Sequence, residues 1–309
     1  MDAHYPVMLS EVLEYLAVRP DQVYVDCTTG LGGHSMEIAK RLTTGRLICL
    51  DADRESLEKA QQRLAEFGGR ICFRQSRFSQ LRQSLTDLGV DRVDGLLADL
   101  GVSRMQLTSA ERGFSLMQDS PLDMRFDRST GQTAEEIVNF SSEHELADLI
   151  YQLGQERRSR KIARAIVRAR PVKTTVSLAN VIEQAVPRAG KLHPATQTFM
   201  ALRMYVNREI EELESLLEQV PAVMAPGGRA VFLSFHSGES GITKKSFQQW
   251  AREGRAELLT KHVVKPQQRE VRENAASRSV TLRCAQWRGP ASGPNEGSKR
   301  GAQTKQEER

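Results

Sequence analysis

The amino-acid sequence predicts an α/β fold in which a mainly parallel, Rossmann-like sheet carries an inserted helical subdomain. Three observations support this prediction. Short apolar runs alternate with helical patterns over the first third of the chain. A glycine-rich turn follows the first run. Well over a hundred residues of polar and helical character separate the fourth run from the fifth, and a loop of that length without secondary structure is implausible in a compact domain.

Five apolar runs are the predicted parallel strands, because they have the length and β-branched content of buried strands. They lie at 23–27, 46–52, 70–75, 95–100 and 229–235. Helices are predicted between the first four runs at 35–42, 54–67 and 79–88. Two later extended stretches, 258–265 and 279–287, predict an antiparallel pair that closes the sheet.

These elements divide the chain into three predicted parts. A core of residues 1–108 and 193–288 holds the sheet, and a helical subdomain of residues 109–192 is inserted into it. Residues 289–309 are rich in Gly, Ser and charge, which predicts a disordered tail. Residues 194–220 predict one long helix whose apolar side chains share a face. These side chains are Phe199, Leu202, Val206, Ile210, Leu213 and Leu217.

The overall composition is that of a folded cytosolic protein with a mild basic excess. The 309 residues carry a formal net charge of +5 and a pI near 9.1, which favours an anionic partner such as nucleic acid. The four cysteines form no CxxC pair, so no metal site is expected. The sequence has no apolar run long enough to span a membrane and no signal peptide, so we expect a cytoplasmic protein.

The first predicted strand leads into the glycine-rich segment DCTTGLGGHS at 26–35. Its glycines allow positive φ and close approach of backbone amides to a ligand, and the next helix adds a positive N-terminus. Asp51 ends the second strand at a spacing that suits the hydroxyls of an adenosine ribose. We therefore predict an adenosine cofactor, either S-adenosylmethionine or NAD. Ser35 weakens the NAD alternative, because a strict dinucleotide motif has Gly or Ala there; a plain turn is the other alternative.

Asp99 closes the fourth predicted strand and is the candidate catalytic residue. At the carboxyl edge of a doubly wound sheet it could hold a cofactor or accept a hydrogen bond from an exocyclic amine. Methyl transfer from a sulfonium needs an oriented acceptor lone pair more than it needs a strong base. The alternative is that Asp99 only caps the following helix. His34 lies in the glycine turn, where we expect a cofactor contact.

Two further segments suggest contact with RNA. Residues 155–170 predict an amphipathic helix with a basic stripe opposite Ile162 and Ile166. The stripe consists of Arg157, Arg160, Lys161, Arg164 and Arg168. It is either a rail for RNA phosphates or a solvated helix face. Residues 111–127 interleave arginine, aromatic and apolar side chains, which either clamp an unstacked base or pack the insertion onto the core. These side chains are Arg112, Phe114, Met124, Arg125 and Phe126.

Several of these segments together match one known family. They include GLGGHS, DLGVS, AERGFSLMQDSPLDMRFD, ERRSRKIARAIVRAR, HPATQTFMALRMYVNREIEELE and APGGRAVFLSFHS. Over residues 4–287 the chain resembles the bacterial 16S ribosomal RNA cytosine-N4-methyltransferases, the MraW or RsmH family.

The resemblance implies a class I methyltransferase fold that uses S-adenosylmethionine. It also implies N4 methylation of a cytosine in the decoding region of 16S rRNA, with the small ribosomal subunit as partner. Carried over by position, the cofactor contacts are Gly32, Gly33, His34, Asp51, Phe78, Asp99 and Gln106. A dimer is a further expectation that the sequence itself does not decide.

The chain also departs from the family pattern on the acceptor side of the expected site. The usual FHSLEDR is FHSGESGIT at 235–243, so an acidic–basic pair is lost or displaced. Arg104 and Met105 replace the usual Ser-Pro before Gln106. These departures keep two alternatives open beside a nucleotide-dependent dehydrogenase. One is a paralogue that methylates a different RNA base, and the other is a non-catalytic RNA-binding or ribosome-assembly factor.

Overall fold

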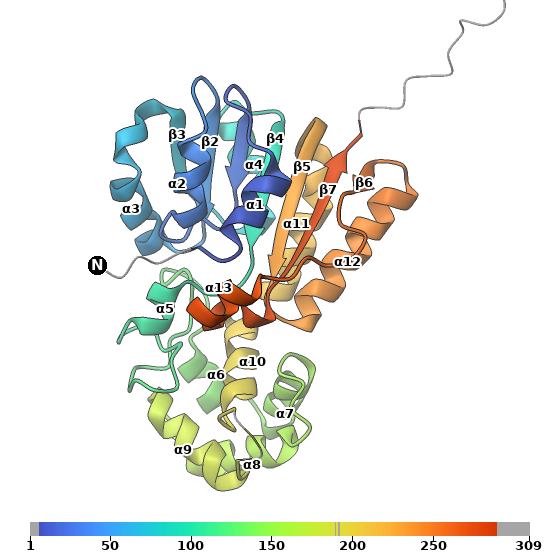
Figure 1. Ribbon diagram of the computed structural model, residues 1–309. Coiled ribbons are helices and arrows are strands. Elements are labelled where there is room, and N and C mark those ends of the chain that lie inside the picture. The colour runs from blue at the N-terminus through green and yellow to red at the C-terminus, as the bar shows by residue number, and fades with distance from the viewer. Residues whose placement is uncertain (1–5, 189, 191, 289–309) are drawn as a thin grey trace, which may run out of the picture.

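The computed structural model describes residues 6–188, 190 and 192–288, and its centre is one mixed sheet (Figure 1). The sheet has seven strands in the order β3-β2-β1-β4-β5-β7-β6. The first five pair in parallel, and β7 is antiparallel to both β5 and β6. The strands are β1 Val23–Asp26, β2 Arg46–Asp51, β3 Ile71–Gln75, β4 Val93–Asp99, β5 Met224–Ser234, β6 Ala256–Leu258 and β7 Thr281–Trp287. The predicted Rossmann-like α/β fold is confirmed.

The strand order places a switch point between β1 and β4. From β1 the chain winds outwards through β2 and β3 on one side, and through β4 and β5 on the other. The loops that follow β1 and β4 therefore diverge, and ligands of such sheets bind in the crevice they leave at the carboxyl edge.

Helices cover both faces of the sheet, because strand side chains alternate between two apolar clusters. Val25 and Ile48 point into one cluster, and Tyr24 and Leu47 point into the other. The first cluster lies under α4 Leu81–Asp87, α11 Glu209–Val223 and α12 Ser237–Arg252. The second lies under α1 Leu9–Leu16, α2 Gly33–Ala39 and α3 Arg54–Arg63. Shorter elements connect the layers: α5 Arg104–Thr108, α13 Gln268–Glu273, η1 Ala65–Arg70, η2 Phe78–Gln80 and η3 Ala275–Ser279.

Five helices between β4 and α11 form a separate lobe with its own apolar cluster. They are α6 Ala134–Phe140, α7 Glu143–Gln152, α8 Ser159–Ala169, α9 Thr175–Ala185 and α10 Thr196–Val206. The lobe stands beyond the carboxyl edge of the sheet (Figure 1). Phe199 and Leu202 of α10 belong to its cluster, so we propose that the inserted unit extends past residue 192, where the sequence had placed its end.

The single helix predicted at 194–220 is wrong, because the chain breaks between α10 and α11. Arg208 adopts a left-handed φ of 52°, and the side chain of Asn207 bonds the carbonyl of Met124 and the amide of Phe126. The two halves also face different cores, since Leu213 packs in the sheet cluster rather than in the lobe. Tertiary hydrogen bonds thus override a continuous helical pattern.

The closing antiparallel pair forms, but its first strand is shorter than predicted. β6 covers only Ala256–Leu258, and Val264 then makes an isolated bridge to Leu282 of β7. Conversely, β5 begins at Met224, five residues before the predicted start at 229. The predicted tail lies outside the described residues. Within the described part of the chain, no helix is both long and apolar enough to span a bilayer.

Candidate functional site

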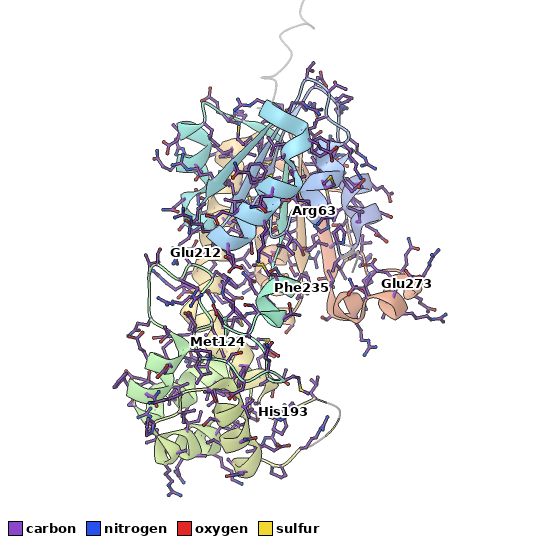
Figure 2. The ribbon with its side chains drawn as sticks, turned by 90° about the vertical axis from the view of Figure 1, so that its left-hand side faces the viewer. Arg63, Met124, His193, Glu212, Phe235 and Glu273 are labelled. Carbon is purple, nitrogen blue, oxygen red and sulfur yellow. The ribbon has the colours of Figure 1, made fainter. Side chains whose placement is uncertain are left out.

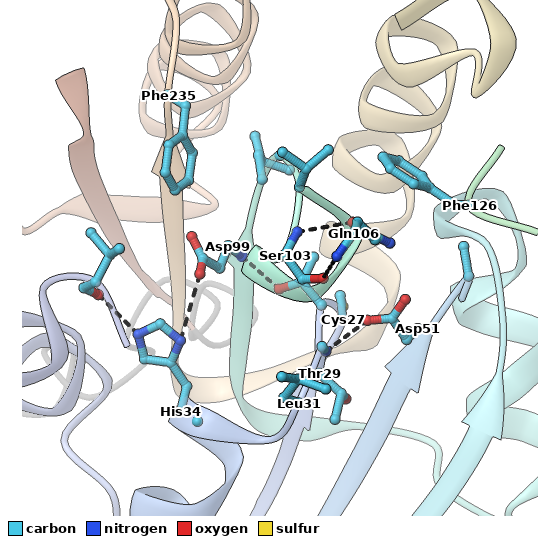
Figure 3. Close-up of a pocket in the computed structure, with 18 of the residues that line it drawn as sticks. Cys27, Thr29, Leu31, His34, Asp51, Asp99, Ser103, Gln106, Phe126 and Phe235 are labelled. Atoms are coloured by element: carbon cyan, nitrogen blue, oxygen red, sulfur yellow. Dashed lines mark hydrogen bonds and ion pairs between the residues drawn. The ribbon is translucent and has the colours of Figure 1, made fainter. Parts of the chain in front are cut away.

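A cavity of about 790 Å³ lies at the switch point, between the sheet and the lobe (Figure 3). Its wall combines the turn after β1, the carboxyl ends of β2 and β4, η2, α5 and the start of α11. Figure 2 shows Glu212 and Phe235, which line it, at the junction between the sheet layer and the lobe. Its volume is typical of pockets that hold a cofactor-sized ligand.

The glycine turn after β1 bends in the way the sequence predicts. Gly30 and Gly32 have left-handed φ values of 51° and 78°, and α2 begins directly at Gly33. A Cβ atom at Gly32 would stand 3.0 Å from the Leu64 side chain, so this glycine permits close packing of α2 against α3. Gly33 lines the cavity, whereas Gly32 shapes the turn from behind it.

Asp51 lies in the cavity wall at the end of β2. One carboxylate oxygen accepts a hydrogen bond from the Gly30 amide at 2.7 Å, and the other accepts from the Asp53 amide at 2.8 Å. Each oxygen keeps further acceptor capacity for a ligand. Burial raises the pKa of Asp51 to about 7, and the nearby charges of Asp53 and Asp26 add to this effect.

Asp99 faces the same cavity from β4, and His34 lies beside it. Asp99 Oδ1 is buried without a hydrogen-bond partner among the described residues, and Oδ2 is 3.7 Å from His34 Nδ1. His34 Nε2 donates to the carbonyl of Val7 at 2.9 Å, which fixes the ring (Figure 3). Burial, followed by the charges of Asp26 and Glu239, raises the pKa of Asp99 well above its ordinary value. A buried carboxylate oxygen without a partner is suited to receive a donor from a ligand.

Phe78 and Gln106, expected only from the family resemblance, also reach the cavity. Phe78 lies in η2, where its ring offers an apolar surface. Gln106 lines the wall, but both ends of its amide already have protein partners. Its Nε2 donates to Asp53 at 2.8 Å, and its Oε1 accepts from the Ser103 amide at 2.9 Å. Its amide therefore holds α5 against the loop after β2.

The sequence reasoning missed an acidic wall on the opposite side of the cavity. It is formed by Glu209, Glu212, Glu239, Glu270 and Glu273 from α11, α12 and α13. Glu209 and Glu212 follow the break after Asn207, so the expectation of one continuous helix hid them. Arg63 and Arg77 are the basic side chains that line the cavity within the described part of the chain. The lining therefore favours a cationic ligand over a polyanionic one.

The altered FHSGES segment keeps an acid in this wall. Glu239 accepts a hydrogen bond from the Phe235 amide at 2.9 Å and lies 3.1 Å from His236 Nε2. Burial opposes ionisation, but the contact with His236 lowers the pKa of Glu239 below its ordinary value. The departures from the family at Ser240 and Gly241 thus leave a carboxylate in place at position 239.

The predicted basic stripe is exposed at the end of the lobe away from the sheet (Figure 1). Ile162 and Ile166 of α8 are fully buried, as expected for an amphipathic helix. Arg164 pairs with Glu143 at 3.2 Å. The other members, Arg157, Arg160, Lys161 and Arg168, are exposed. The stripe residues lie near one another in the structure, but none of them lines the cavity.

The interleaved segment 111–127 packs the insertion instead of presenting a clamp for a base. Arg112, Phe114 and Met124 are 1%, 8% and 0% exposed, and Arg125 is paired with Asp123 at 2.7 Å. The clamp hypothesis is wrong for these four residues. Phe126 alone among the five reaches the cavity.

A model of the MraW methylase family matches residues 1–288. The chain belongs to this family. The predicted resemblance is confirmed, and family membership makes the chain a methyltransferase.

The family relatives include the Ribosomal RNA small subunit methyltransferase H of Solibacter usitatus, 53% identical over 285 residues that cover 92% of this chain and 100% of that protein. The protein of the same name from Thermotoga neapolitana is 42% identical over 289 residues, which cover 92% of this chain and 95% of that protein. An rRNA methylase structure from Streptococcus thermophilus aligns with a TM-score of 0.44 and 10% identity. The alignment covers 91% of this chain and 94% of that one.

The raised pKa of Asp51 predicts a measurable dependence of stability on pH. Because the folded value, about 7, lies above the ordinary 3.8, this carboxyl contributes stability at low pH that is lost as the pH rises towards 7. We expect Asp51→Asn to flatten the fall in melting temperature between about pH 4 and pH 7. The exposed control Asp91→Asn should keep the wild-type slope. Identical slopes for all three proteins in calorimetry would contradict the assignment.

Proposed function

We propose that the protein uses S-adenosylmethionine to methylate N4 of a cytosine in the decoding region of 16S rRNA. The observation that supports this most is the pair Asp51 and Asp99, which face one acidic cavity from β2 and β4 on either side of the glycine turn. The family relatives support the substrate, since they are named as small-subunit rRNA methyltransferases.

The residues present fit this cofactor. Asp51 offers acceptor capacity for the ribose hydroxyls, Phe78 gives the adenine an apolar surface, and the turn at Gly33 admits close backbone approach. When bound, S-adenosylmethionine supplies a methyl group on a positively charged sulfur. The acidic wall complements that charge and opposes the pyrophosphate of NAD. The dehydrogenase alternative is therefore disfavoured.

Asp99 suits the acceptor side of the reaction. Its buried Oδ1 is free to accept a hydrogen bond from an exocyclic amine, which would orient the nitrogen lone pair towards the cofactor. The retained carboxylate of Glu239 shares the same cavity. These two groups favour an active methyltransferase over the non-catalytic assembly factor.

The acidic cavity admits a base but repels phosphates, so affinity for RNA must arise elsewhere. The exposed stripe on α8 provides cations for that purpose, with counterion release as the driving force. A target nucleotide would then extend from an RNA held on the lobe into the cavity at the sheet edge. A dimer and a cytoplasmic location stay predictions.

The proposal is tested by incubating the protein with labelled S-adenosylmethionine and immature small ribosomal subunits, then mapping the modified nucleotide. We expect one N4-methylated cytosine in the decoding region. Methylation at another base would favour the diverged paralogue. Cofactor binding without methyl incorporation would favour the assembly factor, and calorimetric preference for NAD would overturn the proposal.

The raised pKa of Asp99 predicts a pH dependence of methyl transfer. Asp26, Glu239 and His34 face this carboxyl. Its ionised form is the stronger acceptor for an amine that donates, and it is the only form that can take up the amine proton. Activity should therefore fall as the pH drops through the raised pKa of Asp99. Asp99→Asn should lower kcat by about 100-fold or more and remove this acidic limb. The exposed control Asp91→Asn should keep both rate and profile. An Asp99→Asn enzyme with wild-type kcat would leave Asp99 as a structural residue only.

The basic stripe predicts a salt-dependent contribution to RNA affinity. Combined replacement of Arg160, Arg164 and Arg168 by Ala should weaken binding and reduce the slope of log K against log salt by about two to three, at roughly 0.7–0.9 per phosphate contact. The matched control replaces two exposed lysines of α12, Lys244 and Lys245. Equal slopes for wild type and the arginine variant would identify the stripe as a solvated face.

A further inference from the structure

Phe126 is held by its backbone from two sides. Its amide donates to Asn207 Oδ1 at 2.7 Å, and its carbonyl accepts from Arg112 Nη2 at 3.1 Å. Asn207 also donates to the carbonyl of Met124 at 2.8 Å. A side chain whose flanking peptide groups are both fixed has little freedom to leave its position.

Arg112 connects the fixed backbone of Phe126 to the sheet. Its guanidinium is 1% exposed, and Nη2 lies 2.8 Å from Oδ2 of Asp53, which is 3% exposed. Gln106 donates to the same Asp53 oxygen at 2.8 Å. The Asp53 amide in turn donates to Asp51. A continuous set of hydrogen bonds therefore joins Phe126 of the insertion to Asp51 of the sheet.

The ring of Phe126 lines the cavity on the side of Asp51. It stacks on Phe114 with centroids 5.8 Å apart and planes inclined by 18°. Figure 3 shows it on the side of Gln106 and Asp51, whereas Phe235 stands on the side of Asp99. Phe126 also borders a small neighbouring hollow with Asp53, which agrees with this placement.

The contribution of the buried Arg112–Asp53 ion pair to folding stability does not by itself explain its presence. Arg112 Nε and Nη1 have no hydrogen-bond partner among the described residues, and Nη1 is 3.5 Å from the nearest oxygen of Glu55. Desolvation of such a pair offsets much of its attraction, so an apolar pair could give similar stability. What the planar guanidinium does provide is fixed geometry, because Nη2 meets Asp53 and two backbone carbonyls together.

We infer that the inserted lobe completes the cofactor site, with Phe126 as a binding residue for the adenosine half and with Arg112 and Asn207 as its positioning residues. The inference rests on the proposed function, because it takes an adenosine ligand at Asp51. The ring adds an aromatic surface to the one that Phe78 supplies. Cofactor binding and seating of residues 112–127 on the sheet are then one coupled equilibrium.

The test measures binding of S-adenosylhomocysteine to the full chain by calorimetry, without RNA. Phe126→Ala should weaken binding by about 5- to 100-fold, the range for loss of one aromatic stack, and Phe126→Tyr should restore it. Arg112→Lys should also weaken binding, because the shorter lysine side chain ends before the position of Nη2 and cannot keep its three contacts with Asp53 and the carbonyls of Arg125 and Phe126. The control Phe140→Ala removes a ring that is 84% exposed on the lobe and should change nothing.

Hydrogen exchange gives a second measurement. A purely structural role of Phe126 would not change how the ligand affects amide exchange. Addition of S-adenosylhomocysteine should slow exchange of the amides in 112–127 in wild type and less so in Phe126→Ala. If Arg112→Lys fails to fold, Phe126→Ala still decides the question. Wild-type affinity in folded Phe126→Ala would overturn the inference and leave the proposed function intact. Failure of the wild-type chain to bind the ligand would overturn both.

Discussion

The site depends on the convergence of buried carboxylates at the carboxyl edge of a parallel sheet. Asp26, Asp51 and Asp99 end β1, β2 and β4, and the strand order brings these three ends together. Burial raises the pKa of Asp26 to about 6 and that of Asp51 to about 7. Such a cluster is costly unless each group has donors, and Ser35, Thr28 and Gly30 supply them. Asp99 Oδ1 has no such donor within the described part of the chain, which marks the place where a ligand has the most to contribute.

The helical lobe resolves a problem that the sheet alone leaves open. A crevice at a switch point is exposed on its outer side, and the acidic edge cannot attract RNA. The lobe closes that side with Phe126 and carries the basic α8 on its far end. On the proposed function, this separation of acidic cavity and basic helix would let the cavity favour a cationic cofactor while the RNA phosphates stay outside it. The Arg112–Asp53 pair, where the two parts meet, makes the position of one part depend on the other.

The sequence predicted what is local in the chain and missed what is tertiary. The strands, Asp51 and Asp99 could be predicted, because apolar runs and a glycine turn are encoded within a few residues. The break at Asn207 could not, since its cause is hydrogen bonding to Met124 and Phe126 some eighty residues earlier. Glu209 and Glu212 of the acidic wall were missed with it, because they directly follow the break. The role of Arg112 stayed open for a related reason: an arginine among aromatics is compatible with a base clamp and with packing of the insertion, and only its buried partner, Asp53, decides for packing.

The charge of the cavity bears on the direction of the proposed reaction. Methyl transfer converts a sulfonium into a neutral thioether and releases one proton from the acceptor amine. An acidic wall binds the cationic reactant more tightly than the neutral product, so it favours exchange of spent cofactor for fresh. The released proton meets a group able to hold it, because burial raises the pKa of Asp99. The contact that we infer for the ring of Phe126 is with adenosine, which reactant and product share, so it would give affinity without distinguishing them. On the proposed function, the charge of the acidic wall would distinguish the two cofactor states, and the groups around adenosine, Asp51, Phe78 and Phe126, would supply the affinity that both states share.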